Sequence, residues 1–289
     1  MGKIADRRSP KIKRQLIVII LSVIIAALLG VIVALLPEGP GQPEPANTAP
    51  TGEEAHEEPG PSEIVKKEPP KLFIIIDDVG NNLRQLDQFL NLPFSLSFAI
   101  MPKRPFSEEA ARRILAAGHD IILHQPMEPV GEADPGAGVI TTDMNYDEIH
   151  TLLRQNLASV PGVVGINNHM GSKATANRSV MAAVLDFVDQ NGLFFVDSLT
   201  TDDSVAEQVA EELQVEYAKR NSIFLDNHGD ISLIREAVLS GTKIARESGY
   251  AILIGHVQTG ELAPALADMF RELSVQGFTF SGIQDYQFN

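Results

Sequence analysis

Short apolar runs alternate with amphipathic stretches over residues 71–289. The runs have the length and β-branched content of buried strands, and they lie at Leu72–Ile76, Ser95–Ile100, Asp120–Leu123, Val163–Asn167, Leu193–Val196, Glu216–Lys219, Ser222–Leu225, Ala251–Ile254 and Phe278–Ile283. Helical spacing predicts helices over Leu83–Leu90, Ser107–Ala117, Asp147–Ser159, Ser179–Asn191, Ser204–Glu212, Ile231–Ser248 and Glu261–Gln276. Four helices are followed by a glycine in the C-cap position, namely Gly118, Gly192, Gly249 and Gly277.

This alternation predicts an α/β fold, which could be an open doubly wound sheet or a (β/α) barrel. The sequence has no G-x-G-x-x-G or Walker motif that would favour a nucleotide-binding sheet. We therefore expect an irregular (β/α) barrel of about seven strands, formed by one domain over residues 71–289.

The N-terminal part of the chain has the pattern of a membrane anchor. Residues 1–15 carry six Lys or Arg and one Asp, and residues 16–36 are an apolar run without a charge. Such a run is long enough to span a bilayer, and the basic flank should stay cytoplasmic. A cleaved signal peptide is the alternative, but its apolar region is usually shorter. We favour an uncleaved anchor, which predicts a single-pass protein of the inner (cytoplasmic) membrane with an extracytoplasmic body.

Composition and charge exclude several kinds of partner and of catalytic site. Residues 37–70 are rich in Pro, Gly and Glu, which predicts a disordered linker. Of the net charge of −15, −14 falls on residues 71–289, so nucleic acid is a poor partner for this domain. The chain has no Cys, which excludes disulfides, cysteine catalysis and thiolate zinc sites.

Two adjacent acidic residues, Asp77 and Asp78, end the first apolar run. Adjacent carboxylates repel each other unless they share a cation or a proton, so the pair suggests a metal ligand beside a general base. The alternative is that one acid caps the following helix while the other is solvated.

Histidines and further acids follow other runs, and in a barrel all of these strand ends meet on one face. They are His124, His169 and His256, with His228 close behind a run, and Asp197 and Asp226. Imidazole and carboxylate are the ligands of a catalytic zinc or a similar divalent ion, with three protein ligands and a water. A single His after a strand is more often structural. His56 and His150 have no such neighbours, and we expect both to be exposed.

Three polar loop residues have two interpretations each. Asn167 and Asn168, in Gly165-Ile166-Asn167-Asn168-His169-Met170-Gly171-Ser172, could help to bind an oxyanion or sugar hydroxyls, or they could stabilise a turn. Glu128, between two prolines, is either a site residue or a loop acid.

These stretches resemble the divergent polysaccharide deacetylases, relatives of the carbohydrate esterase family 4 deacetylases. The resemblance covers roughly residues 71–289 and rests on Ile76-Asp77-Asp78, on Gly118-His119-Asp120-Ile121-Ile122-Leu123-His124, and on Leu253-Ile254-Gly255-His256. Glu128 stands where the family has its second metal-binding His, and the R-x-P-x-G stretch of the family has no clear counterpart.

The resemblance implies that Asp77 is the general base, Asp78 and His124 are metal ligands, and His256 is the acid that protonates the leaving amine. The third ligand would be His169 or Glu128, and we favour His169 because it is an imidazole. Asp197 or Asp226 could tune His256.

We therefore expect a metal-dependent hydrolase, using a divalent ion such as zinc, that removes N-acetyl groups from an extracytoplasmic glycan. One alternative is a degenerate domain that binds a glycan or an envelope partner without turnover. Another is a metal hydrolase that acts on a peptide or an ester.

Overall fold

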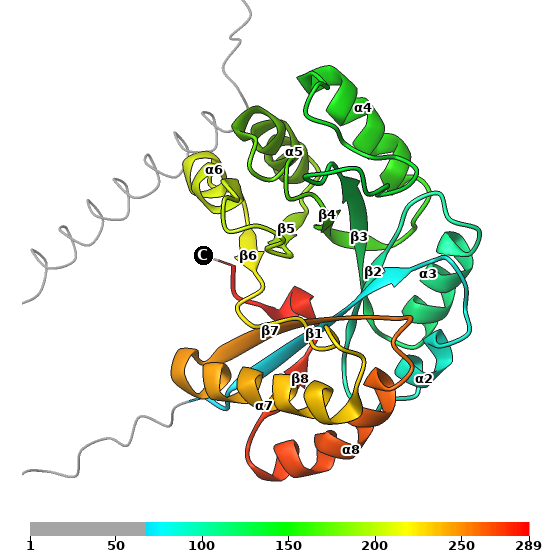
Figure 1. Ribbon diagram of the computed structural model, residues 1–289, viewed down its shortest axis with the longest axis vertical. Helices are drawn as coiled ribbons and strands as arrows, with labels where there is room; N and C mark the ends of the chain where they lie inside the picture. The colour runs from blue at the N-terminus through cyan, green and yellow to red at the C-terminus, as the bar shows by residue number, and fades with distance from the viewer. Residues whose placement is uncertain (1–67, 289) are drawn as a thin grey trace, which may run out of the picture. The chain divides into compact units, whose positions relative to one another are not determined.

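The computed structural model describes residues 68–288. Seven parallel strands form a nearly closed barrel in the order β6-β5-β4-β3-β2-β1-β7, with helices on the outside (Figure 1). The strands are β1 Lys71–Val79, β2 Ser97–Ile100, β3 Asp120–Met127, β4 Val163–Met170, β5 Phe194–Asp197, β6 Tyr217–Lys219 and β7 Tyr250–His256. A short strand, β8 (Thr279–Ser281), pairs with the start of β1.

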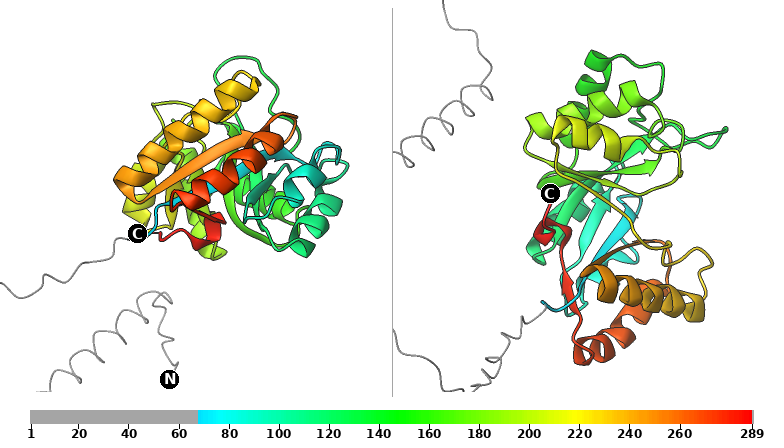
Figure 2. Two further views of the ribbon diagram at one scale, coloured as in Figure 1. Left: turned by 90° about the horizontal axis from the view of Figure 1, so that it is seen from below. Right: turned by 90° about the vertical axis from the view of Figure 1, so that its left-hand side faces the viewer.

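Amphipathic helices cover the outer face of this sheet. They are α2 Leu86–Leu90, α3 Ser107–Ala116, α4 Tyr146–Leu157, α5 Arg178–Gln190, α6 Ala206–Leu213, α7 Ile231–Ser248 and α8 Leu262–Val275. Helix α7 starts at the cap Asp230, whose side chain accepts bonds from two backbone N–H groups, and ends at Gly249 with φ +87°. Figure 2 shows α7 and α8 side by side on the outer side of β7.

The twofold alternation of side chains along each strand separates two apolar layers. In β1, Leu72, Ile74 and Ile76 pack in the layer between the strands and the helices. Phe73 and Ile75 face the barrel interior. Because both faces of the strand are buried, its sequence is almost continuously apolar, as in other parallel sheets.

The barrel is open between β6 and β7, which do not pair. The segment after β6 lies along this gap without joining the sheet: the Leu225 N–H donates to the Ile254 carbonyl at 2.8 Å, and the Ile252 N–H donates to Asn221 Oδ1 at 2.8 Å. The predicted strand at Ser222–Leu225 is therefore wrong. Side chains supply much of its pairing, so a regular ladder does not form.

Most other sequence-based elements are confirmed to within a few residues. The four predicted C-cap glycines all have positive φ. The expectation that His150 is exposed is wrong. It is buried between α4 and α5, with Nε2 3.1 Å from the Ala183 carbonyl oxygen and its ring stacked on Tyr146.

The predicted basic flank, membrane anchor, His56 and nearly all of the linker lie outside the described residues. Between residues 68 and 288, none of the helices is long and apolar enough to cross a membrane. The anchor and the boundaries of the N-terminal segments stay predictions from the sequence.

Candidate metal centre

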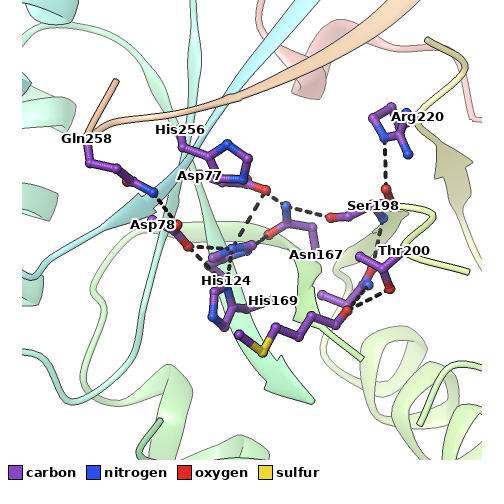
Figure 3. A network of polar contacts seen from close by, with 12 residues as sticks. Asp77, Asp78, His124, Asn167, His169, Ser198, Thr200, Arg220, His256 and Gln258 are labelled. Carbon is purple, nitrogen blue, oxygen red and sulfur yellow. Dashed lines mark hydrogen bonds and ion pairs between the residues drawn. The ribbon is translucent and has the colours of Figure 1, made fainter. Parts of the chain in front are cut away.

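A polar layer lies in the barrel interior at the carboxyl ends of the strands (Figure 3). It continues the inward positions of the apolar layer below: Phe73 and Ile75 lead to Asp77 in β1, and Ile122 leads to His124 in β3. Strand pairing fixes the relative heights of these side chains, because Asp77 is in register with His256 and His124 with Asn167. The fold therefore brings residues from four strands to one end of the barrel.

Asp78 reaches the same place through an unusual backbone conformation. Its φ is +64°, in the left-handed region that a non-glycine residue rarely adopts. The two adjacent carboxylates consequently have different partners. Asp77 accepts a bond from Asn167, whereas Asp78 faces His124 and His169. Backbone strain of this kind is typical of functional sites.

Three potential ligand atoms meet in a compact triangle. Asp78 Oδ1 is 3.2 Å from His124 Nε2 and 3.0 Å from His169 Nδ1, and the two nitrogens are 3.1 Å apart. Asp78 Oδ1 is buried but has no partner with hydrogen-bond geometry. A buried carboxylate oxygen that faces two imidazole nitrogens without a hydrogen bond of its own has the arrangement expected around a cation.

The triangle fits a divalent metal ion. Tetrahedral zinc with ligands at about 2.0–2.1 Å separates them by about 3.3 Å, close to the distances between these three atoms. One carboxylate and two imidazoles leave a fourth position for water or substrate. The side chains of His169 and Asp78 are 20% and 17% exposed, against 2% for His124, so solvent reaches the triangle on the side of His169 and Asp78.

The charges of the cluster suit metal binding. Burial alone would raise the pKa of Asp78, but His124 and His169 hold it well below its usual range, so this carboxylate is ionised. Burial alone would lower the pKa of His124, but Asp77 and Asp78 raise it. Metal binding requires the neutral imidazole, so binding at His124 should weaken as the pH falls.

Asp77 is buried beside this triangle. Asn167 Nδ2 donates to its Oδ1 at 2.9 Å, and its Oδ2 lies 3.7 Å from His124 Nε2. Burial raises the pKa of Asp77, partly offset by His124 and His256. A carboxylate with raised proton affinity next to a metal position is suited to take a proton from an attacking water.

His256 is paired with an acid from outside the strands. Its Nδ1 is 2.9 Å from Asp226 Oδ1, and its backbone N–H donates to Asp226 Oδ2 at 2.8 Å. Burial alone would lower the pKa of His256, but the bond to Asp226 and the charge of Asp77 raise it to about 9. His256 is therefore protonated at neutral pH, and Nδ1 donates to Asp226 while Nε2–H remains for another acceptor.

Three of the predicted site residues, Glu128, Asn168 and Asp197, lie outside the triangle of ligand atoms. Glu128 accepts bonds from the Thr142 N–H at 2.6 Å and from Lys173 Nζ at 2.5 Å, so it joins two loops. Asn168 connects the ends of β4 and β5 by hydrogen bonds. Its Nδ2 donates to the Met170 carbonyl, and its Oδ1 accepts from the Ser198 N–H.

Asp197 points outward from β5. Its carboxylate accepts bonds from Ser204 Oγ at 2.6 Å and from the Leu199 N–H at 2.8 Å. It therefore organises the loop after β5 and does not contact His256. The exposed His228 also lies outside the cluster.

Sequence reasoning did not single out three residues that surround the cluster. Gln258 Nε2 donates to Asp78 Oδ2 at 2.9 Å, and Ser198 Oγ lies 3.3 Å from Asn167 Nδ2. Arg220 donates to the Ser198, Leu199 and Ser222 carbonyls, and its guanidinium lies over the Phe224 ring. Their positions near strand ends could have pointed to them, but many other loop residues share this feature.

Comparisons with known proteins agree with this architecture. A family model described as divergent polysaccharide deacetylase matches residues 74–286. The uncharacterized protein YibQ of Escherichia coli (strain K12) is 35% identical over 186 residues, which cover 64% of this chain and 58% of that protein. An uncharacterized protein of Haemophilus influenzae is 33% identical over 193 residues, which cover 67% of this chain and 69% of the other.

A solved structure is similar in fold. The crystal structure of an uncharacterized protein from Agrobacterium tumefaciens C58 matches with a TM-score of 0.70 at 20% identity, covering 75% of this chain and 88% of that one. This likeness extends the evidence for the barrel to a structure determined by crystallography.

Proposed function

We propose, from the premise that this chain belongs to the divergent polysaccharide deacetylase family, that its barrel is a metal-dependent hydrolase removing N-acetyl groups from an extracytoplasmic glycan. The observation that carries the proposal is the triangle of Asp78, His124 and His169 beside a buried Asp77 and a protonated His256. These are the parts that hydrolysis of an amide requires: a metal position, a base and an acid.

Asp78 Oδ1, His124 Nε2 and His169 Nδ1 would hold the ion, for which we propose zinc because two nitrogens and one oxygen suit it. When bound, such an ion polarises the acetamide carbonyl and acidifies water. Asp77 accepts the proton of the attacking water, and Asn167 keeps the carboxylate turned toward it.

His256 acts as the acid in this proposal. It lies in register with Asp77 on the neighbouring strand, so base and acid flank the same reaction position. Asp226 binds Nδ1 and leaves Nε2–H to protonate the departing amine. The raised pKa of His256 keeps that proton in place at neutral pH. The products are acetate and a free amino sugar.

The test measures metal content and acetate release together. Purified protein loaded with zinc and freed of excess should contain about one ion per chain and release acetate from N-acetylated oligosaccharides. His124→Ala and His169→Ala should lose both properties. His228→Ala, which removes an exposed imidazole outside the cluster, is the matched control and should keep both. Full metal content in His124→Ala would reject the ligand assignment.

A second candidate is a domain that binds a glycan or an envelope partner without turnover. Glu128 favours this alternative, because it stands where the deacetylase family has its second metal-binding His. In this chain it is bound to Thr142 and Lys173. Zinc binding and glycan binding without acetate release would support this alternative. Hydrolysis of a peptide or ester, but not of N-acetyl sugars, would support another substrate class.

We also propose that residues 16–36 anchor the domain in the inner membrane and that residues 37–70 tether it outside the cytoplasm. The basic flank and the uncharged apolar run support this location. In cell fractionation the full chain should stay in the membrane after a carbonate wash. Digestion by protease added outside the inner membrane would show that the domain is extracytoplasmic, whereas protection would contradict the orientation.

A further inference from the structure

Asn167 is a buried amide that connects two functional groups from different strands. It lies in β4, facing inward, and is fully buried. Its Oδ1 is 2.8 Å from His124 Nδ1, and its Nδ2 is 2.9 Å from Asp77 Oδ1. The candidate base and a candidate metal ligand, 47 positions apart in sequence, therefore share one small side chain.

The chemistry of these groups fixes the direction of both hydrogen bonds. The NH₂ end of Asn167 faces Asp77 and donates to its Oδ1, which as a carboxylate oxygen accepts. The carbonyl end then faces His124 and can only accept, so the proton of the neutral imidazole must lie on Nδ1. The lone pair of His124 is consequently on Nε2, the atom that faces Asp78 and His169.

We propose that Asn167 is a positioning residue that, through one amide, holds the carboxylate of Asp77 and selects the metal-binding tautomer of His124. This inference rests on the proposed function for Asp77 but not for His124, whose tautomer is independent of turnover. A ligating imidazole generally needs such a partner on its other nitrogen, and losing the partner typically weakens metal affinity by about 10- to 100-fold.

Gln258 provides an internal comparison. Its amide binds Asp78 Oδ2 and leaves Oδ1 facing the two imidazoles, so it too orients a ligand from its far side. Gln258 is exposed and donates to Asp78, whereas Asn167 is buried and contacts both a ligand and the base. Loss of Asn167 should therefore affect both zinc affinity and turnover, whereas loss of Gln258 should mainly affect zinc affinity.

The first experiment reads the tautomer directly in metal-free protein. In ¹⁵N-edited NMR spectra of the side chains, recorded at a pH where the ring is neutral, His124 should carry its proton on Nδ1 in the wild type. The signal is assigned by its loss in His124→Gln. In Asn167→Leu, which matches the volume without polar atoms, the tautomers should mix and the dissociation constant for zinc should rise about 10- to 100-fold.

Asn167→Asp separates the two halves of the role. Its carboxylate still accepts from His124 Nδ1–H, so the tautomer and the zinc affinity should be largely restored. It has no N–H to donate to Asp77, and the two facing carboxyl groups would share a proton, so Asp77 is no longer free to act as the base and acetate release should stay low, with the loss in kcat rather than in KM. A residue of purely structural importance would not show this split between zinc affinity and turnover.

Asn156→Leu is the matched control. Asn156 is also a fully buried amide, but it donates to the Gln125 side chain and the Gly138 carbonyl. It should leave the tautomer and the zinc affinity unchanged even if it lowers stability. A wild-type His124 with its proton on Nε2 would overturn the proposal, and this measurement needs no variant to fold. So would a folded Asn167→Leu with wild-type zinc affinity. Wild-type protein with the expected tautomer but no acetate release would instead reject the proposed function.

Discussion

The two ends of the barrel are built from the same strands but differ in chemistry. At the carboxyl ends the inward positions hold Asp77, His124 and His256, each with a polar or charged partner. At the amino ends the inward positions hold Phe73 and Phe194, which pack against aromatic residues of the C-terminal segment. The apolar end buries surface, and the polar end buries ionisable groups at a cost in solvation.

Backbone conformation follows the same division. Five described non-glycine residues have positive φ, and four of them lie after or at strand ends on the side of the candidate site: Asp78, Lys103, Met170 and Leu199. The fifth, Gln214, is the C-cap of α6, where such a conformation is common. Each strained residue costs on the order of 1–3 kcal/mol. The comparison indicates that apolar packing at the amino ends stabilises the fold, whereas buried ionisable groups and backbone strain at the carboxyl ends destabilise it.

The base provides the largest expected effect. Asp77→Asn cannot take up a proton, so kcat should fall about 10²- to 10⁴-fold, or about 3–5 kcal/mol in the barrier. Zinc content should be unchanged, because Asp77 is not one of the three ligands. Neutralising a buried carboxylate should also leave the melting temperature equal or higher. Kinetics and calorimetry on the same preparation would check this, and a clear loss of stability would contradict the division between the two ends.

A core variant should show the opposite pattern. Phe73 is buried and its ring centroid lies 5.6 Å from that of Tyr286. Phe73→Ala should lower the free energy of unfolding by about 3–5 kcal/mol through lost burial and a cavity. Zinc stoichiometry of the folded fraction should remain that of the wild type. Denaturant unfolding with metal analysis tests both points, and loss of zinc in folded protein would show that the two ends are coupled.

The acid of the candidate site is tuned by its partner. His256 has its pKa raised to about 9, so its proton is present at neutral pH and is lost as the pH rises through about 9. The Asp226→Asn substitution removes an adjacent negative charge and should lower this pKa by about 1–3 units. The alkaline limb of the activity profile should move down by a similar amount. NMR titration of His256 gives the same pKa without turnover, and an unshifted titration would exclude Asp226 as its cause.

The same pair makes stability depend on pH. A raised pKa in the folded state means that the contribution of His256 to stability is fully present below about 6.5 and is lost toward about 9. Unfolding free energy of the metal-free wild type should therefore fall across this window, and the fall should be smaller in Asp226→Asn.

The smallest effect is expected at Glu128, which lies outside the cluster although its place in the sequence suggests a ligand. Lys173 and Thr142 lower its pKa to about 2, so the loop contact is intact at neutral pH. Glu128→Gln should cost about 1 kcal/mol or less, as for a partly exposed ion pair, and should leave zinc affinity unchanged. Zinc titration decides the point, since weaker binding would return Glu128 to the ligand set.

Local sequence patterns were enough to predict much of this protein. The apolar runs and the glycine C-caps predicted the order of strands and helices, and barrel geometry predicted that Asp77, Asp78, His124, His169 and His256 meet at one end. This worked because hydrophobic periodicity and capping depend on residues close in the chain. The predicted strand at Ser222–Leu225 failed because the side chains of Asn221 and Ser222 take up the Ile252 N–H and carbonyl that a regular ladder would use.

Tertiary structure decided which strand-end residues meet. Phe194 to Asp197 are buried on both faces, so the sequence does not tell which face is inward, and Asp197 points away from the site. Likewise, the bridge from Asn167 to His124 depends on the register between β3 and β4. Register and facing arise from packing between residues far apart in sequence. The sequence by itself therefore determined the set of candidate groups, and only the folded barrel determined their contacts.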